Sequence, residues 1–319
     1  MKKSKTQKSK PGAPGPKSKN RGAAPDSKSR KSAAERSGRA PARNFGESNE
    51  DRRPKTEDRK PKTENLIFGV LPVLEALRAR TRRVEKIIIA EGARERRIAE
   101  IIELARAEGV PFQRVARETL AKQLEPGTVH QGVVAQTSAA DYADADELLD
   151  AVAAVDDALA LVLDGVEDPR NLGAILRVAE CAGVDGTFIP EHRAVGLTET
   201  VVKTSAGATE YARIAKVKNL NRLIEQLKSN NIWVVGTSGE AVIDYTDWDW
   251  TRKCALVLGS EGRGLHRLVA ENCDALVRIP MRGKIESLNV SVAAGVVLFE
   301  AVRQRAAAAK SNSERTETD

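Results

Sequence analysis

The first 64 residues of this 319-residue chain contain no leucine, isoleucine or valine, and Phe45 is their only aromatic residue. A segment with so little apolar surface cannot offset the entropy that it would lose on ordering, so we predict that residues 1–64 are disordered. The segment has 20 Lys/Arg and 8 Asp/Glu, a net charge of +12, whereas the whole chain carries +7. Residues 65–319 therefore carry −5, and the basic character belongs to the N-terminal arm.

A basic disordered arm suits a polyanionic partner, and RNA is the obvious one. We expect weak, salt-sensitive contact with nucleic acid and no sequence specificity from this arm. The alternative is a solubilising tail that has no specific partner.

Cysteine and histidine are also scarce, with three of each in the chain. They are scattered, and no CxxC or paired Cys/His spacing is present. This pattern gives no support to a zinc site, to metal catalysis or to a Ser-His-Asp triad, so we predict no metal. The residues concerned are Cys181, Cys254, Cys273, His130, His192 and His266, which we interpret as core or surface residues.

Long apolar runs are absent as well. None approaches the roughly 20 residues that a membrane span needs, and no apolar segment follows the opening "MKKSKTQKSK" as in a secretory signal. We therefore expect a soluble, cytoplasmic protein without membrane contact.

Periodic patterns begin near Leu66 and predict a small α/β unit over residues 65–137. "NLIFGVLPVLEALRA" and "RRIAEIIELARAEGV" have helical apolar spacing, while "VEKIIIAEG", "PFQRVA" and "GVVAQTS" resemble strands. The acidic, Ala-rich residues 138–158 that follow contain a possible short helix around Glu147–Val155, and we interpret them as a linker.

A second domain is predicted over residues 159–308, followed by a disordered tail at 309–319. Strand-like runs recur at Leu161–Leu163, Thr187–Ile189, Arg213–Ala215, Ile232–Gly236, Ala255–Leu258 and Leu276–Ile279. Helical patterns separate most of them, at Leu172–Ala182, Thr198–Ala206, Leu220–Ser229 and Val290–Ala301. This alternation predicts an α/β fold with a mainly parallel sheet covered on both faces. Ligands of such sheets bind at the carboxyl ends of the strands.

Unusual residues gather after three of these strands. In "LVLDGVEDPRNLGAILRVAECAGV", Asn171 is well placed as a helix N-cap, and Arg177 lies off the apolar stripe. Taken alone, the spacing favours a simple cap for Asn171 and a surface pair between Arg177 and Glu180.

The second group is "CALVLGSEGRGL", where a buried strand opens into a turn with three glycines around Glu261. It does not fit the dinucleotide-binding fingerprint, and as an isolated signal it is weak. The third is "IPMRGKIESLNVSVAAGVVLFEAV", where Pro280 ends a strand and Ser287 or Asn289 can cap the following helix. A capped junction does not explain the length of the polar run "GKIESLN".

Together, the three segments resemble the ordered motifs of the SpoU/TrmH family of the SPOUT superfamily, which are RNA ribose 2′-O-methyltransferases. The resemblance covers about 145 residues, from Ala160 to roughly Arg305. Residues 66–137, with "FGVLPVLEAL" and "VHQG", resemble the RNA-binding, ribosomal-protein-like domain of the subgroup that modifies 23S ribosomal RNA. Within it, the chain is most similar to the guanosine 2′-O-methyltransferases of the peptidyl-transferase-centre loop.

The resemblance implies a C-terminal trefoil knot, a homodimer with the site near its interface, and S-adenosyl-L-methionine as cofactor. The helix at 290–303 would be an interface element. The cofactor would lie among the loops at 237–240, 258–262 and 279–288.

Carried over to this sequence, the family's cofactor contacts fall on Thr237, Gly259, Ile279 and Leu288. Gly259 and Ile279 would act through backbone groups and contact with the adenine, and Leu288 through apolar contact and a backbone bond. Thr237 would line the same pocket. The family's catalytic positions fall on Asn171, Arg177, Glu261, Ser287 and Asn289.

Family mechanisms give the removal of the hydroxyl proton to the arginine. A guanidinium is almost never deprotonated in proteins, so we favour Arg177 as the electrostatic stabiliser of the developing alkoxide and place base action second. Glu261 and Asn289 would orient Arg177 or the ribose. Two alternatives stay open, namely a tRNA ribose methyltransferase and a non-catalytic RNA-binding ribosome-assembly factor.

Overall fold

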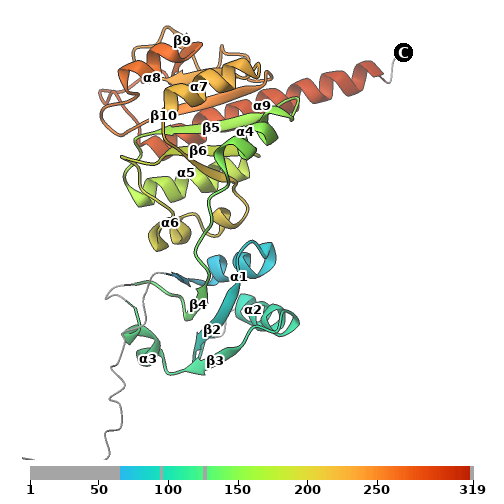
Figure 1. The fold of residues 1–319 in the computed structure, drawn as a ribbon, viewed down its shortest axis with the longest axis vertical. Helices are drawn as coiled ribbons and strands as arrows, with labels where there is room; N and C mark the ends of the chain where they lie inside the picture. The colour runs from blue at the N-terminus through green and yellow to red at the C-terminus, as the bar shows by residue number, and fades with distance from the viewer. Residues whose placement is uncertain (1–64, 94–95, 125–127, 317–319) are drawn as a thin grey trace, which may run out of the picture. The chain divides into compact units, whose positions relative to one another are not determined.

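The computed structural model describes residues 65–93, 96–124 and 128–316, which form two β-sheets with their covering helices (Figure 1). The predicted disordered arm at 1–64 lies outside the described residues. Within the described residues, no helix is long and apolar enough to cross a membrane.

The smaller sheet has four strands in the order β1-β4-β2-β3. β4 (Val133–Thr137) pairs antiparallel with both β1 (Leu66–Phe68) and β2 (Val84–Ala90), while β3 (Phe112–Val115) runs parallel to β2. Helices α1 (Val70–Ala79) and α2 (Arg96–Ala107) bury their apolar stripes in the core of this sheet. The predicted α/β unit is thus confirmed in its helices and main strands, whereas β1 and the short α3 (Arg117–Lys122) were not predicted.

The larger sheet has seven strands in the order β7-β6-β5-β10-β8-β11-β9, and every neighbouring pair is parallel. Its two central strands, β5 (Leu159–Asp164) and β10 (Cys254–Gly259), are buried along their whole length. The other strands are β6 (Gly186–Pro190), β7 (Ile214–Val217), β8 (Trp233–Thr237), β9 (Ile243–Asp244) and β11 (Ala275–Arg278). The predicted parallel sheet is confirmed, because continuous apolar strands need cover on both faces.

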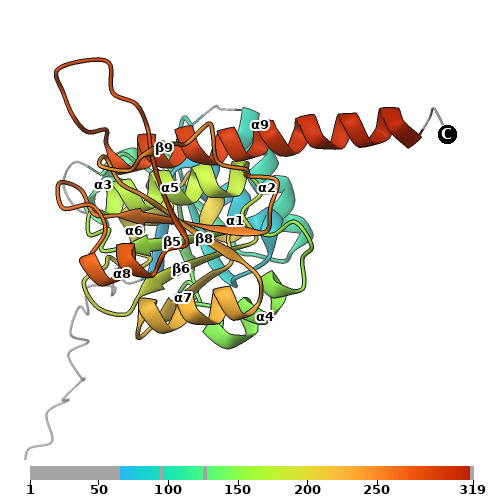
Figure 2. The ribbon, with the colours of Figure 1, turned by 90° about the horizontal axis from the view of Figure 1, so that it is seen from above.

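Helices cover both faces of this sheet (Figure 2). On one face, α5 (Pro169–Cys181) and α9 (Val290–Thr316) pack against each other and against a core that includes Leu161 and Leu256. On the other face, α4 (Ala145–Ala153) and α7 (Leu220–Ser229) cover a core that includes Ala160 and Val257. Successive side chains of a strand point to opposite faces, so alternate residues of β5 and β10 enter the two cores.

Two predicted boundaries were wrong. α4 lies inside the predicted linker, and its buried Leu148, Leu149 and Val152 make it part of the larger core. α9 continues through residues 309–316, which were predicted to be a disordered tail. Its C-terminal half contains four consecutive alanines at residues 306–309, and alanine favours a helix without tertiary packing. The remaining short elements are α6 (Glu199–Thr204), the 3₁₀ turn η2 (Ala208–Glu210) and α8 (Arg267–Asn272).

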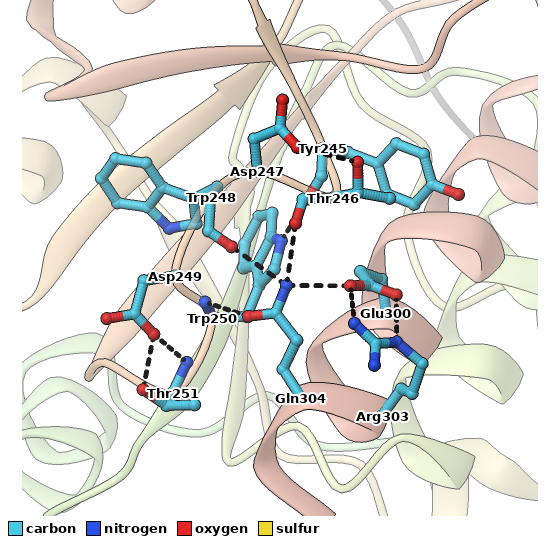
Figure 3. A network of polar contacts seen from close by, with 10 residues as sticks. All are labelled: Tyr245, Thr246, Asp247, Trp248, Asp249, Trp250, Thr251, Glu300, Arg303 and Gln304. Atoms are coloured by element: carbon cyan, nitrogen blue, oxygen red, sulfur yellow. Dashed lines mark hydrogen bonds and ion pairs between the residues drawn. The ribbon is translucent and has the colours of Figure 1, made fainter. Parts of the chain in front are cut away.

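Polar side chains of α9 fasten the segment that leads into β10 (Figure 3). The Gln304 side chain accepts a bond from Trp250 N at 3.0 Å and donates to the Trp248 carbonyl at 3.1 Å. It also donates to Glu300 Oε1 at 2.8 Å, and Arg303 bonds the same carboxylate, which lowers the pKa of Glu300. These contacts hold α9 beside the central strands, so its first residue has a defined place at the carboxyl edge of the sheet.

Candidate active site

The predicted site residues follow the carboxyl ends of neighbouring strands. Since all strands of the larger sheet are parallel, β5, β8, β10 and β11 end at the same edge. Their last residues are in or near register, because Asp164 pairs with Gly259 and Thr237 pairs with Val277. The segments that leave these strands at 165–168, 238–242, 260–266 and 279–289 therefore start at one edge, where ligands of such sheets bind.

Asn171 and Asn289, which are 118 positions apart in sequence, are in direct contact. Asn289 Nδ2 donates to Asn171 Oδ1 at 3.0 Å, and Asn289 Oδ1 accepts from Ser291 N at 2.9 Å. Asn289 is thus the cap of α9, as one of the two predicted alternatives stated. The Asn171 Nδ2 amide donates to no group among the described residues, so its two hydrogens are available to a ligand.

Asn171 is not the N-cap of α5, as the sequence pattern had suggested. Asp168 caps this helix by accepting from Arg170 N at 2.7 Å, and Pro169 occupies the first turn. Asn171 lies one turn further on and is buried, with 8% of its surface exposed. A buried amide away from the cap position needs another partner, which Asn289 supplies.

Arg177 lies on the exposed side of α5, six residues after Asn171. The predicted surface pair with Glu180 is not formed, since no hydrogen bond or ion pair of Arg177 occurs within the part of the chain that the structure describes. Its guanidinium is therefore available to an external anion. The structure does not bring it into contact with the Asn171–Asn289 pair.

The residues after β10 form a tight loop that folds back over the end of the strand. Ser260 N donates to the Gly264 carbonyl at 3.0 Å, and Gly264 N donates to the Ser260 carbonyl at 2.9 Å. A Cβ atom on Gly259 would lie 2.1 Å from the Gly264 carbonyl carbon, so only glycine fits there. Glu261 stands exposed at the tip of this loop.

The segment between β11 and α9 is exposed from Pro280 to Asn289. Within the described residues, no hydrogen bond joins residues 280–288 to the rest of the chain. Ile279 is half-buried against the core below α9, whereas Ser287 is exposed and 41% of Leu288 is accessible. The free backbone groups of this segment are consequently available to a ligand.

The edge formed by Thr237, Gly259 and Ile279 fits an adenosyl group chemically. Thr237 is half-buried, and its hydroxyl makes only a long bond of 3.5 Å to the Val257 carbonyl. Ile279 and Leu288 offer apolar contact, and the loops offer backbone donors and acceptors. An adenine ring needs this combination of apolar surface and a few directed polar groups.

The sequence interpretation missed one pair of side chains at this edge. Asp164, the last residue of β5, is buried and bonds both the backbone N and the ring Nδ1 of His266, at 2.7 and 2.8 Å. The sequence pattern predicts only an ordinary core or surface histidine at His266. A charged residue that ends a fully apolar parallel strand was the available signal, since such residues lie at the ligand edge. Within the described residues, no group of three His, Cys, Asp or Glu side chains could hold a metal ion.

Two family models match the chain. The model of the SpoU rRNA Methylase family matches residues 158–299, and a model described as RNA 2′-O ribose methyltransferase substrate binding matches residues 66–143. All nine predicted site residues lie within the range that the SpoU rRNA Methylase model matches.

This chain aligns with nearly the whole length of two similar proteins. The 23S rRNA (guanosine-2′-O-)-methyltransferase RlmB of Escherichia coli (strain K12) is 40% identical over 240 residues, which is 75% of this chain and 98% of RlmB. RlmB of Xylella fastidiosa (strain 9a5c) is 45% identical over 240 residues, covering 75% and 96% of the two chains.

Solved structures agree with this likeness. The SpoU methyltransferase AviRb from Streptomyces viridochromogenes, in complex with the cofactor AdoMet, superposes with a TM-score of 0.63 at 26% identity. The match covers 76% of this chain and 90% of AviRb. A crystal structure of an RNA 2′-O ribose methyltransferase gives a TM-score of 0.62 at 28% identity, over 75% and 88% of the two chains.

Proposed function

Because the chain belongs to the SpoU rRNA methylase family, we propose that it methylates the ribose 2′-hydroxyl of a guanosine in 23S ribosomal RNA with S-adenosylmethionine as donor. The observation that carries this proposal is the hydrogen bond between Asn171 and Asn289. It lies at the edge of the sheet where the loops after β8, β10 and β11 begin. The RlmB relatives, which span almost the same length, support the choice of 23S rRNA and guanosine.

Thr237, Gly259, Ile279 and Leu288 would hold the cofactor, whose sulfonium supplies an electrophilic methyl group. Backbone groups of the exposed 279–288 segment would bind its polar atoms, and the half-buried Ile279 would contact its adenine. Holding the target hydroxyl in line with that methyl group lowers much of the barrier. The free Asn171 amide and Ser287 are suited to fix the ribose hydroxyls by hydrogen bonds.

Arg177 would stabilise the oxyanion that develops as the hydroxyl proton leaves. A guanidinium keeps its charge at every physiological pH, so this role is electrostatic, and clamping of the adjacent phosphate is compatible with it. Glu261, exposed at the tip of its glycine loop, and Asn289 would orient Arg177 or the ribose.

Residues 65–137 would act as the RNA-binding domain and residues 159–308 as the methyltransferase domain. The order of strands supports a trefoil knot in the latter, because β11 lies between β8 and β9, which residues 238–242 join directly. For β11 to lie between β8 and β9, the chain that follows β11 has to pass the loop at residues 238–242. Such threading is a rare exception to the usual connection rules.

We also propose a homodimer through α9. Val292 and Phe299 lie seven residues apart on this helix and are 51% and 48% exposed. Positions seven apart share one helix face, and large apolar side chains exposed on one face of a helix are typical of an interaction surface. The basic arm would contact RNA through salt-sensitive attraction. Since ribosomes assemble in the cytoplasm, we propose that the enzyme acts there.

The decisive experiment maps 2′-O-methyl groups on RNA from a strain that lacks this protein, and then restores them with purified protein and S-adenosylmethionine. We expect loss of one guanosine methylation in 23S rRNA and its return in vitro. Loss of a tRNA methylation instead would support the tRNA alternative. Unchanged methylation with altered ribosomal assembly would support a non-catalytic assembly factor.

A further inference from the structure

The loop after β10 depends on few contacts for its shape. It contains Gly259, Gly262 and Gly264, and the last two have φ angles of 79° and 68°, which glycine adopts freely. Within the described residues, the two Ser260–Gly264 bonds close the loop on itself, and no bond from residues 260–265 reaches another element. At its far end Leu265 packs against the core of the sheet, and this apolar contact leaves the direction of the chain to be fixed by the hydrogen bonds of the next residue, His266.

Asp164 anchors His266 from the neighbouring strand. Its carboxylate accepts from His266 N at 2.7 Å through Oδ2 and contacts His266 Nδ1 at 2.8 Å through Oδ1. Asp164 is only 4% exposed and pairs in register with Gly259, where the loop begins. The start of the loop and its end are thus both fixed to the same point of the sheet edge.

Both hydrogen bonds between Asp164 and His266 are directional. One carboxylate bonds the backbone and the ring of the same residue, so it fixes the position of the chain and the rotation of the side chain together. The His266 side chain is 48% exposed, and its Cε1 atom lies 3.4 Å from the place where a Cβ on Gly165 would be. A side chain on Gly165 would also be strained, since its φ angle is 81°.

We propose that Asp164 and His266 are positioning residues for S-adenosylmethionine, which hold the Gly259–Leu265 loop in its cofactor-binding conformation before the cofactor arrives. The inference rests on the proposed function. A loop that is already ordered loses less conformational entropy on binding, so the pair raises affinity without touching the cofactor.

Two substitutions of His266 separate this role from mere packing. An asparagine places its Nδ2 close to the position of the histidine Nδ1, so His266→Asn keeps a donor for Asp164. His266→Gln extends its amide past that position, so it loses the ring contact while keeping a polar side chain of similar size. We expect His266→Gln to weaken S-adenosylmethionine binding by about tenfold in calorimetry, as for one lost bond to a charged group, and His266→Asn to restore most of the affinity.

A second readout needs no cofactor. Hydrogen exchange of the amides at 259–266 in the unliganded protein should be faster in His266→Gln than in the wild type, and close to wild type in His266→Asn. The control is His192→Gln, which changes an exposed histidine on another loop. It should alter neither affinity nor exchange at 259–266.

Equal cofactor affinity for the wild type and His266→Gln would overturn the inference, as would unchanged exchange in the loop. A raised KM for RNA with unchanged affinity for S-adenosylmethionine would also overturn it, because His266 would then contact the substrate. A wild-type protein that binds S-adenosylmethionine but does not methylate 23S rRNA would contradict the proposed function instead, while both readouts on His266 would still apply.

Discussion

At the scale of single residues, Arg177 is exposed, and its proposed role depends on the oxyanion and the phosphate of the bound RNA. It has no bond to another described residue, so its removal should cost little stability. We expect Arg177→Ala to lower kcat by about 10²–10³, as for the loss of one charge stabiliser, and to leave the affinity for S-adenosylmethionine nearly unchanged. Single-turnover methylation and calorimetry measure the two quantities. Arg170→Ala, an exposed arginine in the first turn of the same helix, is the matched control, and normal turnover by Arg177→Ala would refute the assigned role.

Gly259 illustrates how the structure changes the reason for a residue. The family resemblance implies that this residue is present for its backbone contacts with the cofactor. In the structure a Cβ would lie 2.1 Å from the Gly264 carbonyl carbon and 2.3 Å from Leu265 N, both backbone atoms that cannot move aside cheaply.

We therefore expect Gly259→Ala to displace the whole loop, to lower the melting temperature and to weaken binding of S-adenosylmethionine. Thermal unfolding and calorimetry test this. Gly183→Ala provides the control at the opposite edge of the sheet, before β6, because the strain at its φ angle of 72° should lower the melting temperature without changing the affinity. Wild-type affinity in Gly259→Ala would contradict the prediction.

At the scale of elements, the start of α9 joins fold and site. Asn289 caps the helix through Ser291 and bonds Asn171 on α5, so one amide side chain connects two helices that pack along each other. Asn289→Ala should lose about 1 kcal/mol of folding free energy from the cap and most of the methylation activity. Denaturant unfolding and methylation assays measure both effects.

The control for Asn289 is Asn219→Ala. Asn219 caps α7 by accepting from the backbone of Asn221 and Arg222, on the other face of the sheet. It should cost a similar free energy of unfolding and leave methylation intact. Equal activity losses in the two variants would mean that Asn289 acts through stability alone.

At the scale of the whole molecule, the exposed apolar face of α9 predicts self-association. Phe299→Glu should convert a dimer into a monomer in sedimentation velocity, because a charge at the centre of an apolar interface is not compensated. Leu268→Glu changes an apolar side chain of α8 that is 52% exposed, and it should leave the dimer intact. A monomeric wild-type protein would contradict the proposed interface.

The sequence alone predicted most of the elements, because their signals are local. Apolar periodicity marked α2, α5 and α7, and continuous apolar runs marked β5 and β10. The order and spacing of three motifs were enough to identify the family, which the matching models and relatives confirm. The short β9, α3 and α8 escaped prediction, since two to six residues carry too little periodicity.

Only the tertiary structure decided which side chains meet. Asn171 and Asn289 are far apart in sequence, and nothing local distinguishes a cap from a buried partner, so Asn171 was assigned the role that Asp168 performs. In the same way, Asp164 and His266 meet because β10 enters the sheet next to β5. The physical reason is common to both pairs: a propensity belongs to a short stretch of chain, whereas a contact at the sheet edge depends on the order in which all the strands assemble.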